Sequence, residues 1–403
     1  MGLALSKLEK YAEVLLWGLA TARAGTGGKM KPYDVVLLKY DPAALPLARA
    51  LHRKLVERRM QVVLRPNSGP GIEKDFFTLA DEKQLAFVDA GMKPLAGSLN
   101  GYIVVRGPES LTHLQDVDPR KFGTAAIARK SWREIMDRRE ETGEFGWTLC
   151  SYPTAELARQ AGLTLPQYTA QIEKACFLNE PDPVGKWKEI FRHATEIKKW
   201  LNALPAETLR LESKSADLTV TLGAARRFLG LSGHNIPSFE LFTSPDWRGT
   251  KGVYFADMPT FYNGNYVKGI RLEFKNGRAV KINAEQGEAF VRKMLAMDRG
   301  ACQVGEFSLT DRRFSKIGKF MADILFDENY GGKYGNSHIA VGSAYSDAYA
   351  GDRAGLTRQL KEKLGFNNSS LHWDIINSEK KRVTAALTSG KTVTVYENGE
   401  FKY

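Results

Sequence analysis

The spacing of apolar residues changes twice within the first 66 residues of the chain. A β-rich run at 33–40 is followed by a helical repeat over 43–60 and by a second β-rich run at 61–65. Strand, helix and strand in this order form a βαβ unit, in which two parallel strands share a covering helix. Further β-type runs occupy 101–106, 124–128 and 146–150. The first part of the chain is therefore predicted to be α/β with a parallel sheet.

Beyond Pro205 the apolar residues alternate with period two, in short runs that turn over quickly. The runs at 268–274 and 279–282, for example, flank the pair Asn276-Gly277. Quick alternation is typical of antiparallel sheets, and an Asn-Gly pair between two runs is a hairpin signal. A mixed, β-rich α+β arrangement is therefore predicted for the C-terminal half.

With 403 residues, the chain is too long for one ordinary hydrophobic core. The stretch 179–183 is polar and rich in proline, which is typical of a boundary. We therefore predict a two-domain α/β protein, with an N-terminal α/β domain at 1–182 and a C-terminal domain at 183–403.

The first 24 residues contain an apolar stretch that is interrupted by Glu9 and Glu13. Its apolar positions follow a helical period, which favours an amphipathic helix over a signal peptide. No apolar run is long enough to span a bilayer, so no membrane partner is expected. Cys150, Cys176 and Cys302 are too widely spaced for a disulfide framework, which suits a reducing compartment. A cytoplasmic location is predicted.

The formal net charge of +12 raises nucleic acid as a partner. The lysines and arginines are spread along the chain, however, and no zinc finger or RNP-like string accompanies them. A basic surface without a nucleic-acid partner is therefore favoured. A basic binding protein without catalytic activity stays open as an alternative.

The triplet His372-Trp373-Asp374, inside the apolar run 371–376, places two potential metal ligands within three residues. This run is typical of a buried strand, whose side chains alternate between two faces. His372 and Asp374 are therefore expected to point the same way, while Trp373 and Ile375 point into packing. An imidazole and a carboxylate side by side on a rigid strand form half of a metal site.

Three carboxylates and one more histidine can complete such a site. His338 opens another buried β-type run, and a glycine-rich loop at 330–336 can fold Glu328 back toward it. A lone histidine in such a run is usually a core residue with satisfied hydrogen bonds. The nearby carboxylate of Glu328 favours a role as a metal ligand instead. Glu306 follows Gly305, which suits a bulge or a close backbone approach. Glu240 lies among apolar neighbours that favour burial.

If these six groups converge, their charges require cations. Carboxylates about 4 Å apart repel each other by about 4 kcal/mol per pair at an effective dielectric of about 20. Two divalent ions would balance four carboxylates, and zinc, cobalt or manganese suits carboxylate and imidazole ligands. Such ion pairs promote hydrolysis, and the phenol of Tyr345 can donate to an oxyanion. HExxH, GxSxG and CxxC motifs are absent, which excludes the commonest zinc-protease, serine-hydrolase and redox patterns.

As an ordered set, several strings of this chain resemble the thermophilic metallo-aminopeptidases, the group of aminopeptidase T, AmpS and PepS. The strings are NIP at 235–237 with ELFT at 240–243, GE at 305–306, FDEN at 326–329, HIAVG at 338–342 and HWD at 372–374. The resemblance spans most of the chain and is thinner over the first hundred residues. It implies an α/β N-terminal domain, a C-terminal domain with two metal ions, and a homodimer that encloses the sites.

Matched residue by residue, the resemblance also implies roles for the six ligand candidates and for Tyr345. The implied metal ligands are Glu240, Glu306, Glu328, His338, His372 and Asp374. Tyr345 would be the catalytic tyrosine, and either Glu306 or Glu240 would be the proton shuttle. The substrates would be peptides with a free N-terminus. Another metal-dependent amidohydrolase on the same site stays open beside true aminopeptidase action.

Overall fold

The computed structural model describes residues 2–352 and 355–403. The chain divides into two compact units. The first comprises Met1–Glu189 and Ser232–Ser238, and the second comprises Ile190–Leu231 and Phe239–Tyr403. Helix α10 (Pro183–Ala203) contains the first point at which the chain passes from one unit to the other.

The first unit is built on a parallel sheet with the strand order β2-β1-β3-β4-β7. The strands are β1 (Val35–Tyr40), β2 (Gln61–Pro66), β3 (Gly101–Arg106), β4 (Gly146–Ser151) and β7 (Asn235–Ile236). Each neighbouring pair in this order is parallel. The parallel α/β sheet predicted from the N-terminal pattern is therefore confirmed.

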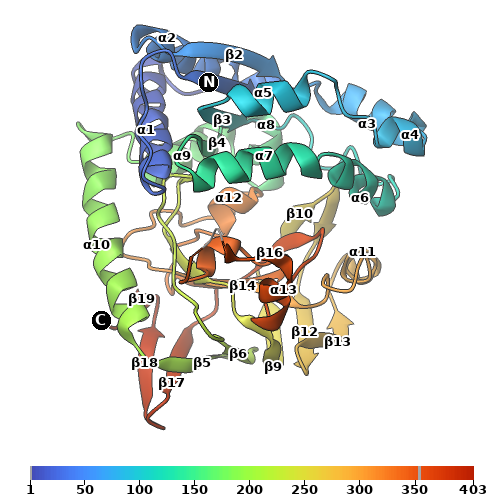
Figure 1. The fold of residues 1–403 in the computed structure, drawn as a ribbon, viewed down its shortest axis with the longest axis vertical. Helices are drawn as coiled ribbons and strands as arrows, with labels where there is room; N and C mark the ends of the chain where they lie inside the picture. The colour runs from blue at the N-terminus through green and yellow to red at the C-terminus, as the bar shows by residue number, and fades with distance from the viewer. Residues whose placement is uncertain (1, 353–354) are drawn as a thin grey trace. The chain divides into compact units, whose positions relative to one another are not determined.

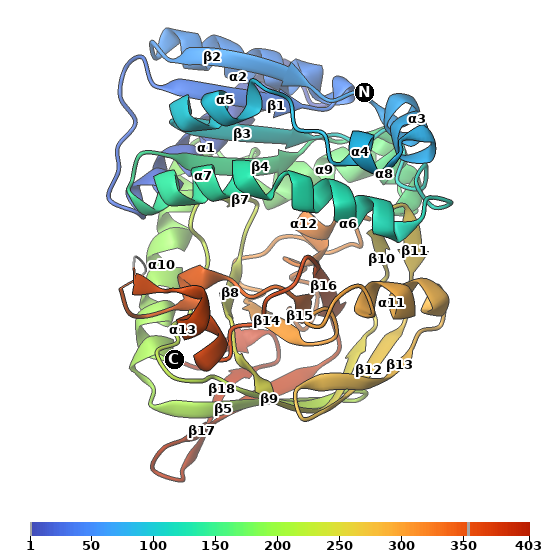
Figure 2. The same ribbon diagram turned by 45° about the vertical axis from the view of Figure 1, so that its right-hand side comes forward.

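Helices cover both faces of this sheet. The three successive residues Val36, Leu37 and Leu38 of β1 are all buried, so neither face of this strand is open to solvent. Leu37 packs with Ala96, Met136 and Phe145 beneath α5 and α7, which Figure 2 shows in front of the sheet. Helices α1 and α2 contact each other, and α1 also contacts β3 and β4. The helices are α1 (Leu5–Ala24), α2 (Leu45–Glu57), α3 (Pro70–Leu79), α4 (Glu82–Leu85), α5 (Met92–Ser98), α6 (Pro119–Ala128), α7 (Lys130–Glu141), α8 (Ala155–Gln160) and α9 (Leu165–Ala175). None of the helices in the described ranges combines the length and the apolar character that crossing a bilayer requires.

The strand predicted at 124–128 is wrong, since these residues form the C-terminal half of α6. Asp118 accepts a hydrogen bond from the backbone N–H of Arg120, and Pro119 occupies the first turn. Both features favour the start of a helix. Alanine is the strongest helix former, so the alanine-rich end of the run continues that helix rather than forming a strand.

The last strand of the first unit comes from a distant part of the chain. The segment Ser232–Ser238 returns to this unit between two stretches of the second one. Its strand β7 pairs with β4, and the backbone N–H of Leu149 donates to the carbonyl of His234 at 2.6 Å. This segment ends immediately before Phe239 and Glu240, so the sheet pairing restrains the chain just ahead of a predicted site residue.

The second unit contains an antiparallel sheet with the order β13-β12-β9-β6-β5-β17-β18-β19, seen in the lower part of Figure 1. Its strands are β5 (Ala206–Ser213), β6 (Asp217–Thr221), β9 (Asp246–Ala256), β12 (Ile270–Lys275), β13 (Arg278–Asn283), β17 (Lys381–Leu387), β18 (Thr392–Glu397) and β19 (Glu400–Phe401). The predicted Asn-Gly hairpin turn is present, with φ of 51° at Asn276 and 77° at Gly277. The antiparallel, β-rich character predicted for the C-terminal half is therefore confirmed.

A smaller antiparallel sheet with the order β16-β15-β14-β8 packs against β9 of the larger one. Its strands are β8 (Glu240–Thr243), β14 (Val304–Thr310), β15 (Asn336–Gly342) and β16 (His372–Asn377). The hydroxyl of Tyr254 on β9 bonds the carbonyls of Ser337 and Ile375 at 2.9 and 3.0 Å. The unit also contains β10 (Thr260–Tyr262), β11 (Asn265–Val267), α11 (Glu288–Leu295), α12 (Ile324–Asp327) and α13 (Arg358–Lys363).

Candidate metal centre

The small sheet of the second unit brings five of the six predicted ligand residues onto neighbouring strands. They are Glu240 on β8, Glu306 on β14, His338 on β15, and His372 and Asp374 on β16. The strands β14 and β15 are buried along their whole length. Trp373, between the two ligand candidates of β16, is 1% exposed and stacks on Tyr262, as its place on the opposite face requires. The sheet therefore supplies a rigid floor for these side chains.

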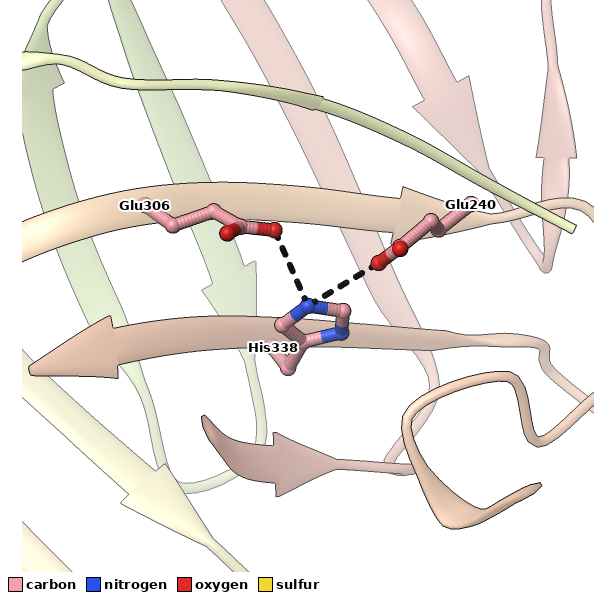
Figure 3. Close-up of side chains that lie close together, drawn as sticks. All are labelled: Glu240, Glu306 and His338. Carbon is pink, nitrogen blue, oxygen red and sulfur yellow. Dashed lines mark hydrogen bonds and ion pairs between the residues drawn. The ribbon is translucent and has the colours of Figure 1, made fainter. Parts of the chain in front are cut away.

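One group consists of His338, Glu240 and Glu306, which point toward one another from three adjacent strands (Figure 3). The Nε2 atom of His338 lies 3.2 Å from Oε2 of Glu240 and 3.3 Å from Oε1 of Glu306. All three residues are buried, and His338 is only 1% exposed. A neutral imidazole can donate one proton from this nitrogen, so it cannot satisfy two carboxylates at once.

The second group consists of Glu306, His372 and Asp374. The Nε2 atom of His372 lies 3.6 Å from Oε2 of Glu306 and 3.6 Å from Oδ1 of Asp374. The other ring nitrogen, Nδ1, is 2.9 Å from the carbonyl oxygen of Ser343, to which it can only donate. This bond directs the lone pair of Nε2 toward the two carboxylates, which is the tautomer that a metal ligand needs.

The spacing of these atoms fits the donor shell of a cation. Donor atoms that surround a zinc ion at about 2.0–2.1 Å lie about 3.3–3.4 Å from one another in a tetrahedron. Within the described part of the chain, Glu306 is the residue common to both groups, with Oε1 facing His338 and Oε2 facing His372. A carboxylate that faces two ligand groups with its two oxygens is suited to bridge two cations.

Glu328 is buried at the end of α12 but belongs to neither of these two groups of described residues. Burial raises its pKa well above the ordinary value, and the charges of Glu240 and Asp374 raise it further. Its Oε1 accepts a hydrogen bond from Nδ2 of Asn329 at 3.3 Å. The charges of the centre thus act on Glu328, while its role as a ligand stays a prediction.

The other titratable groups of the centre influence one another through their charges. Burial raises the pKa of Glu306 to about 7, with a further contribution from the charge of Glu240. Burial by itself would lower the pKa of His372, but the charges of Asp374 and Glu306 raise it to about 9. Burial by itself would raise the pKa of Asp374, but His372 and the charge of His338 together lower it below the ordinary value. Without cations, the centre therefore retains protons.

We expect the metal-free protein to lose stability as the pH rises from about 5 to about 9. Between 4.5 and about 7 the folded state keeps the Glu306 proton that the unfolded state releases. The contribution of His372 is complete below 6.5 and is lost as the pH rises to about 9. Together the two groups should lower the free energy of unfolding by a few kcal/mol.

Thermal unfolding of chelator-treated protein at several pH values measures this loss. Added divalent cation should flatten the profile, because it replaces the protons that hold the carboxylates together. A metal-free protein whose stability is constant or increases between pH 6 and 9 would contradict the expected coupling. The opposite contribution of Asp374 is lost only in acid, below its ordinary pKa of 3.8.

Tyr345 lies beside the second group and is 46% exposed. Its ring contacts the His372 ring edge to face, with centroids 4.8 Å apart, and the ring of Phe242 at 5.6 Å. Although nearly half of the residue is exposed, desolvation of its hydroxyl and the charges of Glu306 and Asp374 raise the pKa of Tyr345 above the ordinary value. The phenol therefore keeps its proton and is available as a hydrogen-bond donor.

Three residues of the centre are not among the sequence-based candidates. Ser308 donates to Oε2 of Glu240 at 3.1 Å, and Asn329 bonds both Glu328 and the backbone N–H of Phe239. Ser343 orients His372 through its carbonyl. Ser308 had a signal in the sequence, because it lies two residues after Glu306 on the same strand face, and Asn329 ends the string FDEN.

Comparisons with known proteins agree in pointing to one group. The family described as thermophilic metalloprotease (M29) matches residues 5–401. Aminopeptidase PepS of Streptococcus thermophilus is 26% identical over 420 residues, which cover 98% of this chain and 97% of that protein. Aminopeptidase AmpS of Bacillus subtilis is 31% identical over 310 residues, which cover 72% of this chain and 74% of that protein.

A solved structure gives the same result for the fold. Wild-type AmpT from Thermus thermophilus superimposes with a TM-score of 0.80 at 26% identity. The alignment covers 98% of this chain and 99% of that one. The similarity therefore extends over both units, including the strands that hold the predicted ligands.

Proposed function

Because this chain belongs to the thermophilic metalloprotease (M29) family, we propose that it is an aminopeptidase that depends on two divalent cations. It would hydrolyse the first peptide bond of peptides with a free N-terminus. The relatives named above carry the name aminopeptidase, which supports this reaction class. The cations are zinc, cobalt or manganese, which the ligand types allow equally.

The observation that carries this proposal is the position of Glu306 between two imidazoles. Its two carboxylate oxygens lie 3.3 Å from Nε2 of His338 and 3.6 Å from Nε2 of His372. Glu240 completes one group and Asp374 the other. Glu328 would add a further carboxylate at the edge of the centre. A single-cation site would not need a carboxylate with a separate histidine at each oxygen.

When bound, the two cations would acidify a water molecule and polarise the carbonyl of the scissile bond. The residues of the chain supply the remaining functions. A carboxylate must accept the proton of the attacking water and pass it to the leaving amine. Glu240 and Glu306 are the candidates, and the Ser308 hydroxyl holds Glu240 in place at 3.1 Å. The hydroxyl of Tyr345 would donate to the oxyanion of the tetrahedral intermediate.

Metal analysis combined with a substrate panel tests the proposal. Purified protein is assayed on aminoacyl amides, on free peptides and on the same peptides with a blocked N-terminus. We expect hydrolysis of the first two classes only, and its loss on chelation, because the buried carboxylates alone supply no Lewis acid. Readdition of zinc, cobalt or manganese should restore activity and identify the metal.

Other outcomes separate the alternatives. Hydrolysis of N-blocked peptides or simple amides at comparable rates would indicate another metal-dependent amidohydrolase. Absence of metal, together with salt-sensitive retention on a polyanion, would favour a basic binding protein instead. The homodimer expected from the sequence stays a prediction, which light scattering in solution measures.

A further inference from the structure

A buried asparagine connects the start of β14 to the end of β15, beside the second ligand group. Asn367 is 5% exposed and lies in the loop between α13 and β16. Its Nδ2 atom donates to the carbonyl oxygens of Gly300 at 2.8 Å and Gln303 at 3.3 Å, and also to that of Gly342. Three carbonyls around one nitrogen assign the amide orientation, because the amide oxygen could not occupy that place.

The acceptors of Asn367 lie where β14 begins and where β15 ends, and these two strand ends meet beside the centre. Gly300 and Gln303 immediately precede β14, whereas Gly342 is the last residue of β15. The backbone N–H of Gly342 in turn donates to the carbonyl of Gln303 at 2.8 Å. One side chain thus ties the entry of the strand that carries Glu306 to the exit of the neighbouring strand.

The start of β14 leads along the chain to Glu306, and the residue after the end of β15 bonds His372. The pairing of β14 and β15 shifts register between Val304 and Glu306, so this bulge aims the Glu306 side chain. A Cβ atom on Gly305 would lie 2.3 Å from the carbonyl oxygens of Gly342 and Ser343, so only glycine permits this approach. The same Ser343 carbonyl accepts the proton of His372 Nδ1.

We infer that Asn367 is a positioning residue that holds Glu306 and His372 at the separation the second cation requires. This inference rests on the proposed two-cation centre. The first group depends on it less, because β14 pairs regularly with β15 from Glu306 onward and with β8 from Phe307 onward, which holds His338 and Glu240 beside it. Loss of the Asn367 amide should therefore affect one cation and spare the other.

Titration of the metal-free protein with Co²⁺ tests the role of Asn367. Binding is monitored by calorimetry and by the cobalt absorption spectrum. The wild type is expected to bind two equivalents. In Asn367→Ala the second equivalent should bind about 10–100-fold more weakly, as is typical when a supporting hydrogen bond of a ligand is lost. The first equivalent should keep its affinity and spectrum, which also shows that the variant is folded.

Asn367→Ser, which keeps one donor on a shorter side chain, should fall between Asn367→Ala and the wild type. Asn368→Ala, at the exposed neighbouring position, is the matched control and should bind both equivalents normally. Equal binding of both equivalents by Asn367→Ala would overturn the inference. So would equal weakening of both, or unfolding of both Asn367 variants, since the residue would then serve the fold in general. A wild-type protein that binds no Co²⁺ would instead refute the proposed function.

Discussion

Replacing Glu306 by glutamine is expected to lower peptide hydrolysis by about 10³-fold or more and to reduce the bound metal from two equivalents to less than one. Glutamine has the same shape but no negative charge, and its NH₂ end cannot bind a cation. One of the two groups therefore loses the carboxylate oxygen that Glu306 supplies, and the other keeps only the neutral amide oxygen of glutamine. Elemental analysis after desalting measures the metal, and initial rates on an aminoacyl amide measure the activity.

Two further variants make the test specific to the shared position. Asp374→Asn and Glu240→Gln each alter one group only, so each should lose about one equivalent while the protein stays folded. The metal-free Glu306→Gln protein should be more stable than the metal-free wild type at pH 8, because burial of the ionised carboxylate is unfavourable. A Glu306→Gln protein with two bound cations and nearly normal activity would refute the shared role.

Tyr345→Phe is expected to lower kcat by about 10²–10³-fold, the usual loss when one oxyanion donor is removed. Phenylalanine keeps the ring contacts with His372 and Phe242, so the loop and the metal content should not change. KM should change little, because the hydroxyl would act on the charge that develops in the transition state. Steady-state kinetics on an aminoacyl amide, with metal content measured in parallel, separates the two parameters.

The matched control for this variant is Tyr349→Phe, four residues further along the same loop. The ring of Tyr349 packs edge to face with Phe366, with centroids 6.4 Å apart, and phenylalanine preserves that contact. Its activity should equal that of the wild type. If Tyr345→Phe also retains kcat within a few-fold, the oxyanion is stabilised by another group and the role assigned to Tyr345 is wrong.

The sequence predicted elements well where a local pattern leaves one solution. The parallel strands β1 to β4 follow from short β-rich runs between helical repeats, and the Asn-Gly turns follow from residues that tolerate positive φ. The prediction failed at α6, where an apolar run with β-branched residues favours a strand by composition. There the cap at Asp118 and the alanine content favoured a helix.

The return of Ser232–Ser238 to the first unit had no signal in the sequence. Its strand β7 has only two residues, which is too short for a period to be recognised. A strand of this length is stabilised by the neighbour that it joins, here β4, and not by its own composition. For the same reason the sequence suggested one boundary near 182 and could not indicate a second crossing.

The amino-acid pattern was enough to identify the candidate ligands and to predict which of them share a strand face. His372 and Asp374 point the same way because side-chain direction along a strand is set within two residues. That Glu306 faces both histidines could be learned only from the folded sheet. That arrangement depends on the order β16-β15-β14-β8, on the bulge beside Gly305, and on partners such as His338, which lies 32 residues away. Contacts at such separations arise from the packing of the whole sheet, and no local pattern of residues encodes them.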